Sequence, residues 1–134
     1  MHLTRDQFAG WLDRYIEAWR SGDPADIGDL FSEDVSYSQN GGQTSLDGRE
    51  AVVADWLEEA YEPNASWEAS YEPLAIEDHV HVAVGSTRYL REGGVREEFS
   101  NIFVCRFDDD GRCSELREWW MLGPSPVERL GDRA

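Results

Sequence analysis

The sequence contains no lysine, and its 12 basic residues are all arginine against 28 acidic residues, for a net charge of −16. A surface so negative repels the phosphates of nucleic acids and anionic lipids, so we expect neither partner. No apolar run approaches the roughly 18 residues that a membrane-spanning helix needs, and residues 1–6 lack the apolar core of a signal peptide. We therefore expect a cytoplasmic protein.

The sequence also lacks the common motifs for cofactors and metals. There is no Gly-Lys-Ser/Thr phosphate loop and no Gly-x-Ser-x-Gly nucleophile motif. His79 and His81 have no matching acid or cysteine nearby in the pattern, so we expect two outward-facing surface histidines. The Asp108–Asp110 run lacks the alternating ligands of a calcium loop. We expect no metal and no cofactor.

Three helices are indicated in the first half of the chain. Thr4 and Gln7 form a capping box, and Asp23-Pro24 starts a second, short helix. Asp47 caps a third helix, whose expected core face is Val53, Trp56, Leu57 and Ala60. The first helix carries one wide apolar stripe, made of Phe8, Trp11, Leu12, Tyr15, Ile16 and Trp19.

Strands dominate the rest of the chain, after a short strand at 35–38 and an expected loop at 39–46. Alternation over 66–72 predicts a half-buried strand, which Pro73 places at a sheet edge or bend. Three long strands follow between 80 and 122, with turns at Gly93-Gly94 and Asp110-Gly111. Residues 123–134 are expected to form a loosely packed tail of a single domain spanning 1–134.

Whether a turn has an even or an odd number of residues predicts which side chains of the two strands it joins share a face. Tips at Gly93-Gly94 and Asp110-Gly111 place even residues of 80–90, odd residues of 99–107 and even residues of 116–122 together. This more apolar face is assigned to the helices and a pocket, and it includes Arg88, Asn101 and Glu118. The same phasing puts Cys105 and Cys113 on opposite faces, which predicts two free thiols.

Charges within an apolar wall must be paired. The three polar groups either orient a ligand or move a proton, or an Arg88–Glu118 salt bridge simply braces the sheet. The opposite face, with Ile102, Val104, Trp119 and Met121, is also apolar. A partner subunit would cover it, so we expect a homodimer through the outer sheet face; scattered exposed aromatics on a monomer are the alternative.

The chain resembles the nuclear-transport-factor-2-like superfamily, and within it the SnoaL-like group of small bacterial proteins. The resemblance rests on the order of elements and on segments 15–23, 30–35, 48–52 and 106–112. It implies an α+β cone, in which a strongly bent, mainly antiparallel sheet wraps around three N-terminal helices and encloses a ligand cavity.

The resemblance also supplies templates for the site. Ketosteroid isomerases of the superfamily use a tyrosine on the first helix, which Tyr15 matches, but their two acids fall here at Gln39 and near Phe103. Epoxide hydrolases similar to limonene-epoxide hydrolase hold water with a tyrosine and an asparagine; that segment fits Gln39-Asn40, but the tyrosine position falls at Ser38, with Tyr37 one place off. Glu118 fits their late acid, while Arg88 lacks its acid two residues on. SnoaL-type cyclases use a single acid, a role that Glu118 fits.

Two hypotheses follow. In the first, the protein binds or processes a small apolar or aromatic metabolite by cofactor-independent isomerisation, cyclisation or hydration. Glu118 would be the acid or base, Arg88 would orient it or an oxyanion, and Tyr15 would donate a hydrogen bond. The second hypothesis is a non-catalytic homodimeric association domain. The expected ligand contacts are Trp19, Asn40, Trp56, Phe99, Asn101, Phe103 and Trp120.

Overall fold

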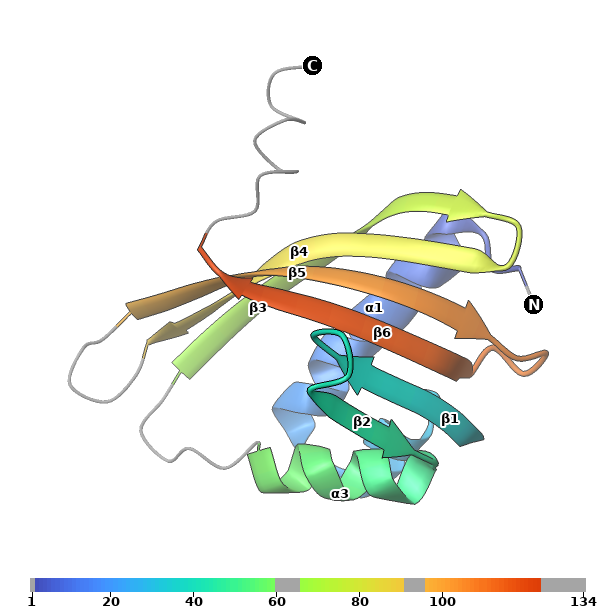
Figure 1. Cartoon of the computed structure of the whole chain (residues 1–134), viewed down its shortest axis with the longest axis horizontal. Helices are drawn as coiled ribbons and strands as arrows, with labels where there is room; N and C mark the ends of the chain where they lie inside the picture. The colour runs from blue at the N-terminus through green and yellow to red at the C-terminus, as the bar shows by residue number, and fades with distance from the viewer. Residues whose placement is uncertain (1, 60–65, 91–95, 124–134) are drawn as a thin grey trace, which may run out of the picture.

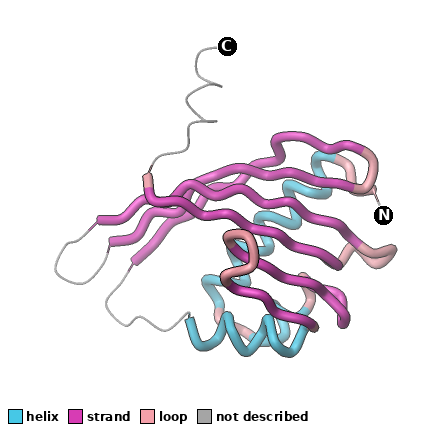
Figure 2. Tube along the Cα trace, in the orientation of Figure 1, coloured by secondary structure: helices cyan, strands magenta, loops and turns pink. Residues whose placement is uncertain are grey.

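The computed structural model describes residues 2–59, 66–90 and 96–123. Three helices and six strands are present in that part of the chain (Figures 1 and 2). The helices are α1 (Arg5–Ser21), α2 (Pro24–Gly28) and α3 (Arg49–Glu59). The strands are β1 (Phe31–Gln39), β2 (Thr44–Asp47), β3 (Ser66–Glu77), β4 (Val80–Leu90), β5 (Arg96–Phe107) and β6 (Cys113–Leu122).

The strands form one sheet in the order β2-β1-β6-β5-β4-β3. All neighbours are antiparallel except β1 and β6, which run parallel. Helix α1 lies across one face of the long strands, while α3 lies beside β1 and β2 (Figure 1). The fold is therefore the expected α+β cone, with β6 joining the two parts of the sheet. No helix among the described residues is long and apolar enough to cross a membrane.

Helix α1 begins at the predicted capping box and ends at a glycine. The Thr4 side chain accepts a hydrogen bond from the Gln7 backbone, the Gln7 side chain accepts one from the Thr4 backbone, and Gly22 closes the helix at φ 64°. Its apolar stripe fills the cone, where the Trp11 indole donates to the Leu30 carbonyl at 3.1 Å. The stripe thereby ties α1 to the start of β1.

Two local expectations in the first half are wrong. Residues 44–47, expected mainly in a loop, form strand β2, because the turn at Asn40–Gly42 folds the chain back onto β1. In α3 the most buried side chains are Val52 and Trp56, while Leu57 is 40 % exposed. The core face of α3 is thus rotated from the expected one, and Ala60 lies outside the described residues.

The register between β4 and β5 differs from the expected one, and the difference exchanges the inner and outer faces of β4. Leu90 pairs with Arg96, which leaves five residues between the strands rather than an even number. Because side chains alternate along a strand, this shift of one position moves the even residues of β4 to the outer face. Arg88 therefore lies outside, where it pairs with Glu98 and Glu68, and His81 lies in the core. The expected tip at Gly93-Gly94 itself lies outside the described residues, as does the expected tail beyond Gly123.

The turn between β5 and β6 gives the expected facing of side chains. Phe103 pairs with Glu118 and Asn101 with Trp120, so these four residues share the inner face. A bulge after Arg106 then changes the register, and Phe107 pairs with Cys113. Cys113 consequently turns inward and is buried near Cys105, not on the opposite face. Both cysteines are free thiols.

Candidate active site

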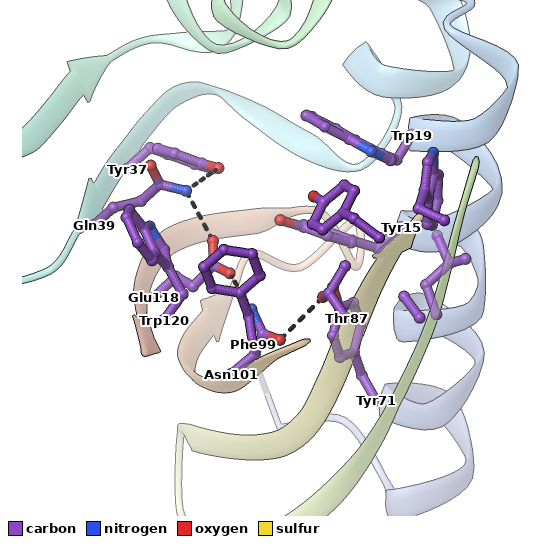
Figure 3. Close-up of a pocket in the computed structure, with 14 residues that line it drawn as sticks. Tyr15, Trp19, Tyr37, Gln39, Tyr71, Thr87, Phe99, Asn101, Glu118 and Trp120 are labelled. Atoms are coloured by element: carbon purple, nitrogen blue, oxygen red, sulfur yellow. Dashed lines mark hydrogen bonds between the residues drawn. The ribbon is translucent and has the colours of Figure 1, made fainter. Parts of the chain in front are cut away.

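A cavity of about 240 Å³ opens between α1 and the inner face of the sheet (Figure 3). Its walls come from α1, β1, β3, β4, β5 and β6, so no two neighbouring elements could build it alone. Aromatic rings make up most of the lining. The lining residues are Tyr15, Ile16, Trp19, Tyr37, Gln39, Trp67, Ala69, Tyr71, Thr87, Tyr89, Phe99, Asn101, Glu118 and Trp120.

Glu118 is the acid of this cavity, and its residue is only 6 % exposed. The parallel pairing of β1 with β6 places Gln39 directly beside it. The Gln39 Nε2 donates to Glu118 Oε1 at 2.9 Å, and the Asn101 Nδ2 donates to Oε2 at 3.0 Å. Two carboxamide N–H donors, one on each oxygen, suit the ionised carboxylate, which only accepts hydrogen bonds.

The amide of Asn101 is itself held from the other side. Its Oδ1 accepts a hydrogen bond from the Thr87 hydroxyl at 3.0 Å, and the Thr87 oxygen lies 2.6 Å from the Tyr71 hydroxyl. Since Thr87 has given its only proton to Asn101, Tyr71 must be the donor to Thr87. Figure 3 shows this row of side chains running across the wall of the cavity.

A pair of tyrosines forms the second polar group of the cavity. The Tyr37 oxygen accepts from the Trp56 indole at 3.3 Å and from Gln39 Nε2 at 3.4 Å, and the Tyr15 and Tyr37 hydroxyls are close enough to influence each other. Burial, reinforced by the negative charge of Glu118, raises the pKa of both phenols well above their usual value. Both phenols are therefore neutral and can donate a hydrogen bond to a ligand.

The cavity has a single sign of charge. Its described lining includes the carboxyl group of Glu118 but no arginine, lysine or histidine. Burial also raises the pKa of Tyr71, so this residue too stays uncharged. Within the described residues, no group of three or more histidine, cysteine, aspartate or glutamate side chains is placed to hold a metal ion.

The structure brings six of the ten predicted site residues to the cavity wall: Tyr15, Trp19, Phe99, Asn101, Glu118 and Trp120. Trp56 and Phe103 are completely packed in the core behind that wall. Asn40 turns away and bonds to the backbone of β6, accepting from the Trp120 N–H at 2.9 Å. The prediction for Arg88 is wrong. The shifted register between β4 and β5 places this residue on the outer face of the sheet.

Sequence reasoning does not find several of the cavity residues, chiefly Tyr37, Tyr71, Thr87 and Tyr89. The parity predicted for β4 places the last two on the outer face, which is wrong. Tyr71 belongs to an alternating strand, and its alternation with Trp67 and Ala69 is the signal that could have found it. Tyr37 and Gln39 alternate in the same way at the end of β1.

The bent sheet over α1, with a cavity at its inner face, defines a nuclear-transport-factor-2-like cone. The family model for the SnoaL-like domain matches residues 12–116, and the chain therefore belongs to that family. Glu118 lies just beyond the matched segment.

Individual relatives agree with this assignment. A steroid Δ-isomerase of Nocardioides simplex is 31 % identical over 115 residues, which are 85 % of this chain and 89 % of that protein. An epoxide hydrolase of M. tuberculosis similar to limonene-epoxide hydrolase aligns with a TM-score of 0.68 at 14 % identity, covering 87 % of this chain and 84 % of its own. An NTF2-like protein of unknown function from Mesorhizobium loti aligns with a TM-score of 0.63 at 22 % identity, covering 87 % of this chain and 93 % of its own.

Proposed function

We propose that this protein is a cofactor-independent enzyme that moves a proton on a small, uncharged, largely apolar carbonyl compound. The observation that carries the proposal is the Glu118 carboxylate, held by Gln39 and Asn101 inside an aromatic cavity that also contains the Tyr15–Tyr37 pair. A base and a neutral hydrogen-bond donor in one largely apolar cavity are the two groups that enolisation requires.

The proposed step is balanced within the site. An oxygen of Glu118 takes a proton from the carbon next to the carbonyl group, and the C–H electron pair becomes the enol double bond. The carbonyl π electrons move onto its oxygen, which accepts a hydrogen bond from the tyrosine pair. Glu118 then returns the proton to the same or to another carbon, so isomerisation needs no further reactant.

The relationship to the steroid Δ-isomerase relative supports this reaction class, although the acid comes from another strand. The position expected for the base in ketosteroid isomerases is Gln39, which cannot abstract a proton. Its side chain lies 2.9 Å from Glu118. The carboxylate of β6 therefore stands beside the place where the acid of β1 would be, and we propose that it replaces that acid.

Exchange of substrate hydrogen with D₂O tests the proposal without knowledge of the natural substrate. A panel of a Δ5-3-keto steroid and smaller cyclic and aryl ketones is incubated with the protein, and NMR follows deuterium entering next to the carbonyl group. We expect catalysed exchange in at least one ketone, and a loss of about 10²–10⁴-fold in Glu118→Gln. Binding of these ketones without any exchange, or exchange that Glu118→Gln leaves intact, would refute the proposal.

A second role is association through the outer face of the sheet, and it is compatible with the first. Even residues of β4 and β5 and odd residues of β6 place an apolar patch there, consisting of Val82, Val84, Ile102, Val104, Trp119 and Met121. We propose a homodimer through this patch, supported by its flanking ion pairs: Arg88 with Glu98 at one end and Arg106 with Glu115 at the other. Because both ends of the patch carry arginine and glutamate, the arginines of one copy could face the glutamates of a second copy across a twofold interface.

A further inference from the structure

We propose that Tyr71 and Thr87 are positioning residues, which act through Asn101 to keep Glu118 a hydrogen-bond acceptor and hence a base. The inference rests on the proposed function and assigns a role to two residues that lie on strands remote from Glu118 in the sequence. It follows from the direction of three consecutive hydrogen bonds.

The direction of the row follows from the hydrogen bond between Thr87 and Asn101. Thr87 donates its single proton to Asn101 Oδ1 at 3.0 Å, so the hydroxyl at 2.6 Å from its oxygen, that of Tyr71, must be a donor. With its carbonyl oxygen taken by Thr87, the Asn101 amide can present only its NH₂ group to Glu118. That group meets Oε2 at 3.0 Å.

Reversal of the amide would change the chemistry of Glu118. If the Asn101 carbonyl turned toward Glu118, the two oxygens could make a good contact only when Glu118 carried a proton. The protonated acid would then be stabilised and the base weakened. Thr87 opposes this reversal, because a turned amide would require its hydroxyl to accept from the NH₂ group and to donate to Tyr71 instead, so both other hydrogen bonds of the row would have to reverse as well.

Gly85 allows Tyr71 to occupy its place. It pairs with Tyr71 across β3 and β4 and with Asn101 across β4 and β5. A Cβ atom built on Gly85 would lie 2.6 Å from the Tyr71 ring and would overlap the Ser70 carbonyl oxygen. Without a side chain at position 85, the Tyr71 ring packs against the sheet beside Phe103 (ring centroids 4.9 Å apart), and its hydroxyl reaches Thr87.

The other titratable groups around Glu118 do not compete for this control. Tyr15 on α1, Tyr37 on β1, Tyr71 on β3 and Cys105 on β5 all interact with its charge, and each has a raised pKa. They are therefore neutral over the range in which a carboxyl group titrates. Of the two hydrogen bonds from carboxamide groups to Glu118, the one from Asn101 is the bond that a mutation of Thr87 alters directly.

The test is the titration of Glu118, read from the ¹³C shift of its carboxyl carbon and assigned with Glu118→Gln. In Thr87→Val, which keeps the shape but removes the hydroxyl, we expect the midpoint to rise by about one pH unit, the equivalent of one hydrogen bond to a charged group. Tyr71→Phe should move it in the same direction by less. Thr87→Ser, which retains the hydroxyl, should titrate near the wild type.

Ser86→Ala is the matched control, since it removes a hydroxyl from the neighbouring position of β4, on the outer face. A midpoint that is the same in Thr87→Val and Ser86→Ala, in variants that remain folded, would overturn the inference. If ketone exchange is found, its acid limb should move to higher pH in Thr87→Val while the plateau at high pH is retained. If no exchange is found, the proposed function fails, and the titration still decides the role of Thr87.

Discussion

The backbone N–H of Leu3 donates to Nε2 of His81 at 3.0 Å, although the two residues are 78 positions apart. His81 is fully buried, and its Nδ1 faces the Cys105 carbonyl oxygen at 3.4 Å. The ring is therefore the neutral tautomer with its proton on Nδ1, and it fastens the segment before α1 to strand β4. Protonation of Nε2 would set an N–H group against the N–H of Leu3.

This arrangement predicts a loss of stability in mild acid. Burial, aided by the nearby His2 ring, holds the pKa of His81 below its usual 6.5. Because the folded pKa is the lower one, the unfolded chain binds the proton first, and the free energy of unfolding falls as the pH drops below about 6.5. One proton limits the slope to about 1.4 kcal/mol per pH unit.

Urea unfolding of the wild type and of His81→Gln between pH 8 and pH 5 measures this effect. The glutamine can still accept from Leu3 but does not titrate, so the difference between the two proteins removes the contribution of the many carboxyl groups. We expect the difference to shrink toward acid pH. Parallel stability curves would show that His81 does not titrate on unfolding.

A second acid at position 39 should create a pair of carboxyl groups that share a proton. In Gln39→Glu the new group would replace an N–H donor 2.9 Å from Glu118. The repulsion raises the folded pKa of the pair, so the loss of stability grows as the pH rises. We expect Gln39→Glu to be about 3 kcal/mol less stable than the wild type at pH 8, and much closer to it at pH 5. Gln39→Ala, which loses one hydrogen bond to the carboxylate without adding charge, should show a smaller pH dependence in the same direction.

The cavity should discriminate against anions. Since its described lining contains Glu118 and no positively charged side chain, a carboxylate ligand would meet a like charge in a site of low dielectric constant. Quenching of tryptophan fluorescence by naphthaleneacetamide and by naphthaleneacetate compares two ligands of nearly equal shape. We expect the amide to bind at least about tenfold more tightly at pH 7, equivalent to about 1.4 kcal/mol, and the preference to shrink in Glu118→Gln. Equal binding in the wild type would contradict this account of the cavity.

Trp119→Asp tests the proposed homodimer. The substitution places a charge on the outer apolar patch, across from Ile102, while the neighbouring Trp120 keeps its place at the cavity. We expect sedimentation velocity to show a wild-type dimer, a monomeric Trp119→Asp variant, and unchanged ligand binding. Gln43→Asp adds the same charge at the exposed turn between β1 and β2, outside the patch residues, and should remain dimeric. A monomeric wild-type protein would exclude this interface.

Two glycine-to-alanine substitutions should have opposite effects. Gly85→Ala forces a methyl group onto the Ser70 carbonyl and the Tyr71 ring, so we expect a loss of about 3 kcal/mol or more. Gly10 is exposed in the middle of α1, and a methyl group added there would meet no atom within 4 Å. Gly10→Ala should therefore gain about 1 kcal/mol from helix propensity alone. Thermal unfolding of both variants measures the contrast.

Much of the fold could be predicted because local signals were strong. The capping box, the stripe on α1 and the parity of the turn at Asp110-Gly111 each depend on residues close in sequence, and each is confirmed. The prediction of which residues of β4 face inward is wrong. It depends on whether the connection to β5 has an even or an odd number of residues, and the pair of glycines does not determine that number. Valines at 80, 82 and 84 could not correct the error, since both faces of this sheet are apolar.

The candidate site was only partly predictable for a different reason. Glu118 and Asn101 follow from the register of one hairpin, but Gln39 reaches Glu118 through the parallel pairing of β1 with β6, which no turn signals. Thr87 and Tyr71 depend on the reversed face of β4. Apart from Asn101, the residues that hold the acid thus depend on pairings that no turn in the sequence signals correctly, whereas the acid itself follows from a local one.

The position of β6 in the middle of the sheet has a consequence for synthesis of the protein. Until residues 113–122 leave the ribosome, β1 and β2 have no strand to join them to β3, β4 and β5. The nascent chain then exposes two unpaired strand edges, which are sites for association with other chains. The sheet cannot be completed before the strand that also delivers Glu118, so the cavity cannot form ahead of it.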